Sequence, residues 1–79
     1  MKIAVIILNW NGRKMLEKYL PSVVQHTAGE VIIADNGSTD DSIAFLKEHY
    51  PSLRIIALDK NYGFAEGYNK AIAQVEADY

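Results

Sequence analysis

The sequence predicts an α/β domain in which three parallel strands alternate with three helices. Short apolar runs rich in β-branched residues recur three times along the chain, as buried strands require. Each run is followed by a polar turn and then by apolar residues at the three-to-four-residue spacing of an amphipathic helix. Consecutive strand–helix units are joined by right-handed crossovers, so the strands should be parallel and lie in one sheet.

The first unit begins with the longest apolar run, Ile3–Leu8, whose unbroken apolar character predicts a strand buried on both faces. Residues 9–12 (Asn-Trp-Asn-Gly) interrupt this pattern and form a loop. From Met15 to Val24 the apolar residues follow helical spacing, which predicts a helix. Pro21 lies inside this segment and has no backbone N–H, so we expect the helix to bend or restart there.

The second unit has a short apolar strand at Val31–Ala34, a polar turn at residues 35–41 and a helix that runs to about Tyr50 and stops before a proline. The turn is rich in residues that cap helices. We expect Ser38 or Thr39 to accept a hydrogen bond from the free amides at the start of the helix.

The third unit comprises a strand at Leu53–Leu58, a turn at residues 59–63 and a helical stripe from Phe64 to Val75. In sheets of parallel strands, functional groups gather on the loops at the carboxyl ends of the strands. The unusual polar clusters of this sequence fall in those loops, which are residues 9–12, 35–41 and 59–63.

The composition excludes several classes of function. The chain has 79 residues, a mass of 8.8 kDa and a formal net charge of −2, so it forms one domain at most and lacks the basic surface of a nucleic-acid-binding protein. The absence of cysteine excludes disulfides and thiolate zinc sites, and the two histidines are too few for a metal cage. The longest apolar run is far shorter than the roughly 20 residues that span a bilayer.

The loops also lack the two common phosphate-binding signatures. A dinucleotide-binding turn needs Gly-x-Gly-x-x-Gly after the first strand, where this chain has Gly12 alone, and no P-loop motif is present. The second loop instead begins with Asp35, a carboxylate that can accept hydrogen bonds from a ribose hydroxyl or a base imide. The alternative is that Asp35 only bonds loop amides near Ser38, and its position alone leaves both open.

Three segments in order resemble the opening of glycosyltransferase family 2. They are residues 3–12 (IAVIILNWNG), residues 32–40 (IIADNGSTD) and residues 61–71 (NYGFAEGYNKA), and the resemblance covers essentially the whole chain. It implies that the chain is the β-α-β-α-β-α parallel-sheet half of a GT-A fold, a Rossmann-like fold of nucleotide-diphospho-sugar transferases. It also implies transfer of a sugar from a nucleotide-diphosphate donor to an acceptor hydroxyl, with inversion.

The resemblance further implies a pocket for the donor nucleotide. Asp35 matches the acid that hydrogen-bonds the uracil or ribose of the donor. Trp10 either stacks on the base or covers the sheet, and the sequence leaves both open. The positions implied to bind nucleotide are Asn9, Trp10, Asn11, Asp35, Asn36, Ser38, Asn61 and Gly63.

The chain departs from the family pattern after its third helix. Family members continue with a fourth strand and an Asp-x-Asp motif that holds Mg²⁺ or Mn²⁺, and a later acid serves as the base. The sequence contains neither, so we expect residues 1–79 to be a partial GT-A domain that binds no metal and has no catalytic residue, within a longer metal-dependent parent. We expect the acidic pair Asp40 and Asp41 to serve a helix N-terminus rather than a metal.

The implied partners are a nucleotide-diphosphate sugar, with UDP or dTDP as the nucleotide, and an acceptor glycan or lipid-linked sugar. These partners imply that the longer parent protein takes part in cell-envelope polysaccharide synthesis. We expect the parent protein to act in the cytoplasm, and at the inner face of the membrane if its acceptor is lipid-linked. The open sheet edge, where a fourth strand belongs, predicts a homo-oligomer. The alternative is a non-catalytic α/β interaction module or a receiver-like regulatory module, but a receiver needs acidic residues at the end of its first strand, where this chain has Asn9.

Overall fold

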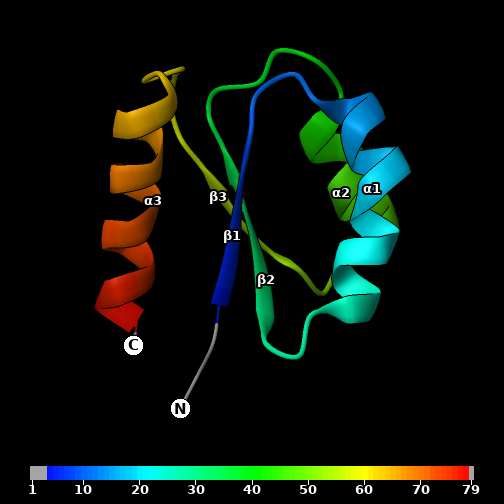
Figure 1. Ribbon diagram of the computed structural model, residues 1–79. Helices are drawn as coiled ribbons and strands as arrows, with labels where there is room; N and C mark the ends of the chain where they lie inside the picture. The colour runs from blue at the N-terminus through cyan, green and yellow to red at the C-terminus, as the bar shows by residue number, and fades with distance from the viewer. Residues whose placement is uncertain (1–3, 79) are drawn as a thin grey trace.

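The computed structural model describes residues 4–78, in which three strands and three helices alternate along the chain (Figure 1). The strands form one parallel sheet in the order β1-β2-β3. The predicted α/β class and β-α-β-α-β-α order are therefore confirmed. Ile3, the predicted first strand residue, lies outside the described residues. The elements in chain order are β1 (Ala4–Asn9), α1 (Arg13–His26), β2 (Glu30–Asp35), α2 (Ser42–His49), β3 (Arg54–Ala57) and α3 (Phe64–Asp78).

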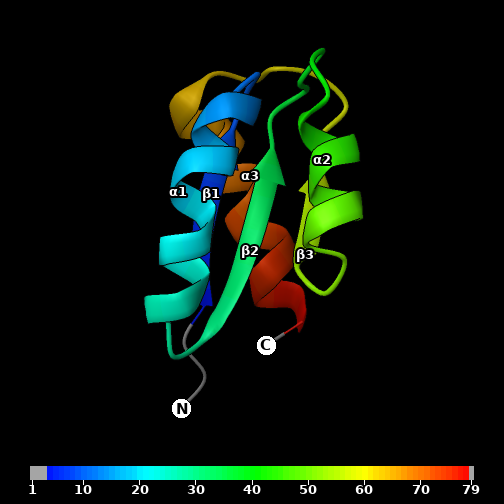
Figure 2. The same ribbon diagram turned by 90° about the vertical axis from the view of Figure 1, so that its right-hand side faces the viewer.

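The sheet lies between two layers of helix: α1 and α2 cover one face and α3 covers the other (Figures 1 and 2). Because successive side chains of a strand point to opposite faces, neighbouring isoleucines of β2 enter different cores. Ile33 packs with Leu20 and Leu46 under α1 and α2, whereas Ile32 packs with Val75 of α3. All three β2 residues from Ile32 to Ala34 are fully buried, which makes β2 the centre of the fold.

The prediction that the first apolar run is buried on both faces is wrong for this structure. Residues 4–8 of β1 are only half-buried, and Asn9 is the one β1 residue that is buried. The reason is topological, since within residues 4–78 β1 pairs only with β2 and lies at an edge of the sheet, whereas β2 has a strand on each side. The apolar pattern is the same in both strands, but the number of neighbouring strands differs.

Pro21 does not restart the first helix, because α1 runs without interruption from Arg13 to His26. A proline inside a helix removes the hydrogen bond to the carbonyl four residues earlier, which here belongs to Glu17. Both Pro21 and Glu17 are exposed. Water can therefore bond the carbonyl that lost its partner, and the helix tolerates the proline on its solvent side.

Candidate functional site

The loops after the three strands meet at one end of the sheet, opposite the end where the first described residues lie (Figure 1). This follows from the parallel arrangement, because all three strands point the same way. Asn9 and Asp35 end β1 and β2 and are partners in the strand register, so their side chains start from neighbouring positions. The eight predicted nucleotide-binding residues all lie in this region.

The first cluster at this end is a polar group formed by Asn9 and Asp35, which are buried, and Ser38, which is partly buried. The side-chain amide of Asn9 donates to Asp35 Oδ1 at 2.9 Å and to Ser38 Oγ at 3.3 Å. The Ser38 hydroxyl donates to Asp35 Oδ1 at 2.7 Å, and its backbone N–H donates to Asp35 Oδ2 at 3.0 Å. Asp35 is only 1% exposed. These are the loop contacts that the alternative interpretation of Asp35 expects, and a contact of Asp35 with a nucleotide stays a prediction.

Asn11 turns its side chain towards the loop between β2 and α2. Its Oδ1 accepts hydrogen bonds from the backbone N–H groups of Thr39 at 2.7 Å and Asp40 at 3.1 Å. Its own backbone N–H donates to Ser38 Oγ at 2.9 Å. Asn11 has a φ of 50°, in the left-handed region that asparagine tolerates better than most residues. The loop of residues 10–12 is thereby bonded to the neighbouring loop.

Asp40, rather than Ser38 or Thr39, caps the helix that follows. Asp40 Oδ1 accepts from the backbone N–H of Ser42, the first residue of α2, at 3.0 Å, and also from the Ser42 hydroxyl. Its second oxygen accepts from the backbone N–H of Arg13 at 3.2 Å, so one carboxylate bonds the first residues of two helices. Sequence patterns miss this arrangement because it depends on two loops meeting in space.

The electrostatic state of Asp40 reflects these bonds. Partial desolvation acts to raise the pKa of Asp40, but hydrogen bonds from the hydroxyl and amide of Ser42 and from the amide of Arg13 outweigh it. The pKa of Asp40 therefore lies below its ordinary value. The carboxylate favours its charged form, which is the form that the positive ends of two helix dipoles stabilise.

The third loop is tied to β2 through Asn36. The side-chain amide of Asn36 donates to Asn61 Oδ1 at 3.1 Å and to the Gly63 carbonyl at 3.0 Å, and Asn36 Oδ1 accepts from the backbone N–H of Tyr62 at 3.0 Å. Gly67 of α3 packs directly over this amide, since a Cβ on Gly67 would lie 2.8 Å from Asn36 Nδ2. Asn36 therefore joins the end of β2 to the third loop and to α3.

A shallow hollow opens between the first and third loops. Its volume is about 250 Å³, and its lining residues are Leu8, Trp10, Asn36, Asn61, Gly63 and Phe64. Trp10 and Phe64 are 54% and 75% exposed, so two large aromatic side chains that contribute little to the core stand at this hollow. Gly63 has a φ of 81°, and no atom lies within 4 Å of where its Cβ would be.

The structure thus divides the eight predicted residues into two groups. Four of them line the hollow, and the other four form the hydrogen-bonded network beside it. The first group is Trp10, Asn36, Asn61 and Gly63, and the second is Asn9, Asn11, Asp35 and Ser38. Sequence reasoning missed Phe64, because its place at the start of an apolar helical stripe suggested a core residue, whereas the side chain is exposed.

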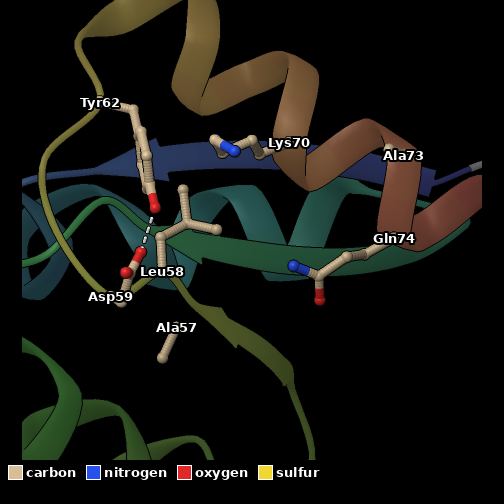
Figure 3. A pocket seen from close by; sticks show the side chains of 7 residues that line it. All are labelled: Ala57, Leu58, Asp59, Tyr62, Lys70, Ala73 and Gln74. Atoms are coloured by element: carbon tan, nitrogen blue, oxygen red, sulfur yellow. Dashed lines mark hydrogen bonds between the residues drawn. The ribbon is translucent and has the colours of Figure 1, made fainter.

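A second hollow, of about 390 Å³, lies between the end of β3 and α3 (Figure 3). In it the Tyr62 hydroxyl donates to Asp59, and Lys70 Nζ lies 4.4 Å from the centre of the Tyr62 ring. The hydrogen bond holds the pKa of Asp59 below, and that of the Tyr62 phenol above, their ordinary values. These contacts fix Tyr62, and with it the loop that carries Asn61 and Gly63.

Within residues 4–78, no three or more histidine, aspartate or glutamate side chains lie close enough together to hold a metal ion. The carboxylates of Asp35 and Asp40 each accept three hydrogen bonds from neighbouring residues of the protein. In the same stretch of chain, no helix is both long and apolar enough to span a bilayer.

Comparison with known proteins gives relatives over nearly the whole chain. An N-acetylglucosaminyl-diphospho-decaprenol L-rhamnosyltransferase of Mycobacterium tuberculosis is 31% identical over 75 residues, which cover 92% of this chain and 24% of the relative. A teichoic acid poly(glycerol phosphate) polymerase of Staphylococcus epidermidis is 31% identical over 84 residues, covering 99% of this chain and 12% of the relative. A chondroitin synthase of Escherichia coli is 35% identical over 75 residues, covering 89% of this chain and 11% of the relative.

The chain spans about a quarter or less of the length of these curated relatives. No solved structure matches it at a significant level. The sequence profile described as Glycosyl transferase family 2 matches residues 4–79, which is almost the entire chain. The three segments that carry the resemblance supply the loops at the carboxyl ends of the strands. The chain therefore belongs to glycosyl transferase family 2.

Proposed function

We propose that this chain binds the nucleotide of a sugar donor, as the donor-binding part of an inverting glycosyltransferase that moves a sugar from a nucleotide diphosphate to an acceptor hydroxyl. The observation that carries the proposal is the hollow between Trp10 and Phe64 at the carboxyl ends of the strands. Ligands of open α/β sheets bind at this end. Membership of the family supports the choice of a nucleotide sugar and argues against the receiver-like alternative.

The chemistry of the hollow suits a planar base. Aromatic side chains bind bases through their faces, and each base–aromatic stack contributes about 1–3 kcal/mol. Asn61 accepts hydrogen bonds from Asn36 and Gly63 through Oδ1, whereas its Nδ2 donates no hydrogen bond within residues 4–78. That amide can donate to a carbonyl oxygen of a pyrimidine base.

The size of the hollow also matches one part of a donor. Pockets that enclose a whole small-molecule ligand have volumes of roughly 300–1,000 Å³. The hollow, at about 250 Å³, fits a base or a ribose, and the diphosphate and sugar would extend beyond it. We propose UDP- or dTDP-sugars as the donors, because uracil and thymine offer the carbonyl oxygens that Asn61 can bond.

For the acceptor we propose a glycan or a lipid-linked sugar. The support is the names of the relatives, which include a transferase acting on N-acetylglucosaminyl-diphospho-decaprenol and a chondroitin synthase. We place the reaction on the cytoplasmic side, at the inner face of the membrane where the acceptor is lipid-linked.

We propose that the 79-residue chain alone binds the donor without transferring the sugar, and that a longer enzyme containing it depends on Mg²⁺ or Mn²⁺. The support for the first part is that Asp35 and Asp40 are engaged in hydrogen bonds within the protein. Transfer and donor hydrolysis would be assayed with the chain and with the longer enzyme, each before and after chelation of divalent cations. Transfer by the chain alone, or transfer by the longer enzyme that chelation leaves unchanged, would contradict this proposal.

Calorimetric titration with UDP, dTDP and ADP tests donor binding. Saturable binding of UDP or dTDP is expected, weakened about tenfold in Trp10→Ala and in Phe64→Ala, since each variant removes one stacking face. Met15→Ala is the matched control, because Met15 is another exposed large apolar residue and does not line the hollow. The proposal fails if neither pyrimidine nucleotide binds, or if the two aromatic variants bind as tightly as Met15→Ala.

A further inference from the structure

Trp10 lies between two residues that are both bonded to the loop between β2 and α2. Asn9, before it, is bonded to Asp35 and Ser38 through its side chain, and its carbonyl accepts from the Asn36 N–H at 2.7 Å. Asn11, after it, is bonded to the same loop through its backbone N–H and its side chain. The Trp10 indole itself is half exposed. The position of this ring therefore depends on how firmly its two neighbours are held.

The side chain of Asn11 is largely used within the protein. Both lone pairs of Oδ1 are occupied by the backbone N–H groups of Thr39 and Asp40, and Nδ2 donates to Thr39 Oγ1 at 3.3 Å. Asn11 is also absent from the lining of the hollow between Trp10 and Phe64. It therefore offers little to a nucleotide directly, although its sequence position suggests a ligand contact.

A hydrogen bond at Arg13 also attaches the first loop to the loop between β2 and α2. Asp40, whose N–H donates to Asn11, accepts in return from the backbone N–H of Arg13. The two loops thus hold each other by reciprocal bonds on both sides of Gly12. A Cβ on Gly12 would lie 2.5 Å from Asn9 Oδ1, so the loop is packed closely at this point as well.

We propose that Asn11 is a positioning residue of the donor site: its Oδ1 holds Trp10 in place through the β2–α2 loop, and it raises affinity for the base without touching it. The inference rests on the proposed function for the identity of the ligand. The physical reason is preorganisation, since a ring that is already fixed loses less conformational freedom when a base stacks on it.

The test uses Trp10 as its own probe, because the chain contains one tryptophan. Time-resolved fluorescence anisotropy reports the local motion of the indole without any nucleotide present. Asn11→Gly keeps the left-handed backbone and removes the oxygen acceptor, whereas Asn11→Asp keeps an oxygen acceptor. Thr39→Val is the matched control, because it removes the two long contacts of the Thr39 hydroxyl, with Asn11 Nδ2 at 3.3 Å and Oδ1 at 3.4 Å, and leaves the short bond from the Thr39 N–H to Asn11 Oδ1 in place.

Asn11→Gly should show faster local motion of the indole than the wild type at unchanged helix content by circular dichroism. Its dissociation constant for UDP or dTDP should rise about three- to tenfold, the effect expected from freeing one side chain. Asn11→Asp and Thr39→Val should stay within about twofold of the wild type in both measurements. The proposal is overturned if Asn11→Gly matches the wild type, or if Asn11→Asp is as impaired as Asn11→Gly.

Amide hydrogen exchange in the wild-type chain gives a second reading that needs no variant. The N–H groups of Thr39 and Asp40 lie in an exposed loop, yet both donate to Asn11 Oδ1 and should exchange at least about tenfold more slowly than in an unstructured peptide. Unprotected exchange would also overturn the proposal. If anisotropy and exchange behave as expected but the wild type binds neither UDP nor dTDP, the proposed function fails and the fixing of Trp10 by Asn11 stands.

Discussion

Gly37 and Gly63 both have positive φ angles, of 74° and 81°, but only Gly37 lacks room for a side chain. A Cβ on Gly37 would lie 2.4 Å from the carbonyl carbon of Lys60 and 2.6 Å from the backbone N of Asn61. Gly37 therefore allows the second loop to pack on the backbone of the third, whereas Gly63 only requires an unusual backbone angle.

This difference predicts unequal costs for the same substitution. Gly63→Ala should lower the free energy of unfolding by about 1–2 kcal/mol, the strain of a left-handed alanine. Gly37→Ala adds a clash with backbone atoms that cannot rotate away, so its cost should exceed about 3 kcal/mol. Urea unfolding followed by circular dichroism measures both, and equal losses would show that the second and third loops do not pack as described.

Asp40 predicts a dependence of stability on pH. Because its folded-state pKa lies below the ordinary value of 3.8, the carboxylate stabilises the fold above that pH. This stabilisation disappears as the pH falls through the folded pKa. Asp40→Asn should therefore lose less stability than the wild type between pH 6 and pH 3, as measured by urea unfolding at each pH.

Asp41→Asn is the control for this experiment, because it removes a neighbouring carboxylate that makes no capping hydrogen bond to α2 and only a long ion pair, of 3.9 Å, with Arg13. Asp40→Asn should lose less stability than Asp41→Asn over the same pH range. If Asp40→Asn shows the same acid loss as Asp41→Asn, then the carboxylate of Asp40 does not hold the two helix starts.

At the level of elements, Pro21 lies inside α1 and lowers the stability of that helix. Proline inside a helix costs about 3 kcal/mol relative to alanine, and part of this is offset because proline restricts the unfolded chain. Pro21→Ala should restore a hydrogen bond to the Glu17 carbonyl and raise the free energy of unfolding by about 1–2 kcal/mol. Pro51→Ala, outside the helices, should give no gain. An unchanged urea midpoint for Pro21→Ala would contradict this account of α1.

The strands and helices could be predicted because, in each unit, the spacing of the apolar residues and the polar turns between elements indicate the same boundaries. The structure places α2 and α3 within a few residues of the predicted spans, and the loops after the strands carry the polar clusters, as expected. The half-exposed state of β1 could not be predicted, since its sequence resembles that of β2 and the difference lies in the number of neighbouring strands. The tolerance of Pro21 likewise depends on which side of α1 faces solvent.

The same limit applies to the candidate site. The contact between Asn9 and Asp35 follows from parallel strands that end in register. The role of Asp40 at the start of α2 follows from its place in the sequence, but its bond with the Arg13 N–H of α1 and the exposure of Phe64 do not, because they depend on how separate parts of the chain meet. A local pattern indicates which residues end a strand or start a helix, but not which loop lies across from them.

At the level of the whole molecule, the free edge of β1 predicts self-association. Among the described residues β1 pairs only with β2, and beside it lies an apolar groove of about 300 Å³ that includes Met15 and Tyr19, which are both exposed. An open edge next to apolar surface favours pairing with a second copy. Sedimentation velocity should show dimers or larger species that increase with concentration.

Tyr19→Lys should shift the distribution towards monomer by placing a charge in this groove. Ile72→Lys on α3 is the control, because Ile72 is also exposed but does not line the groove. A wild-type chain that sediments as a monomer at every concentration, or an equal response to both substitutions, would contradict association through β1.

The central claim is that the hollow between Trp10 and Phe64 receives the nucleotide of a sugar donor. A titration of the isotopically labelled chain with UDP and dTDP, followed by heteronuclear NMR, tests it most directly. The account predicts saturable shifts concentrated on the Trp10 indole, the Asn61 side-chain amide and the amides of Gly63 and Phe64. Saturable shifts confined to another part of the chain, or no saturable shift with either nucleotide, would contradict it.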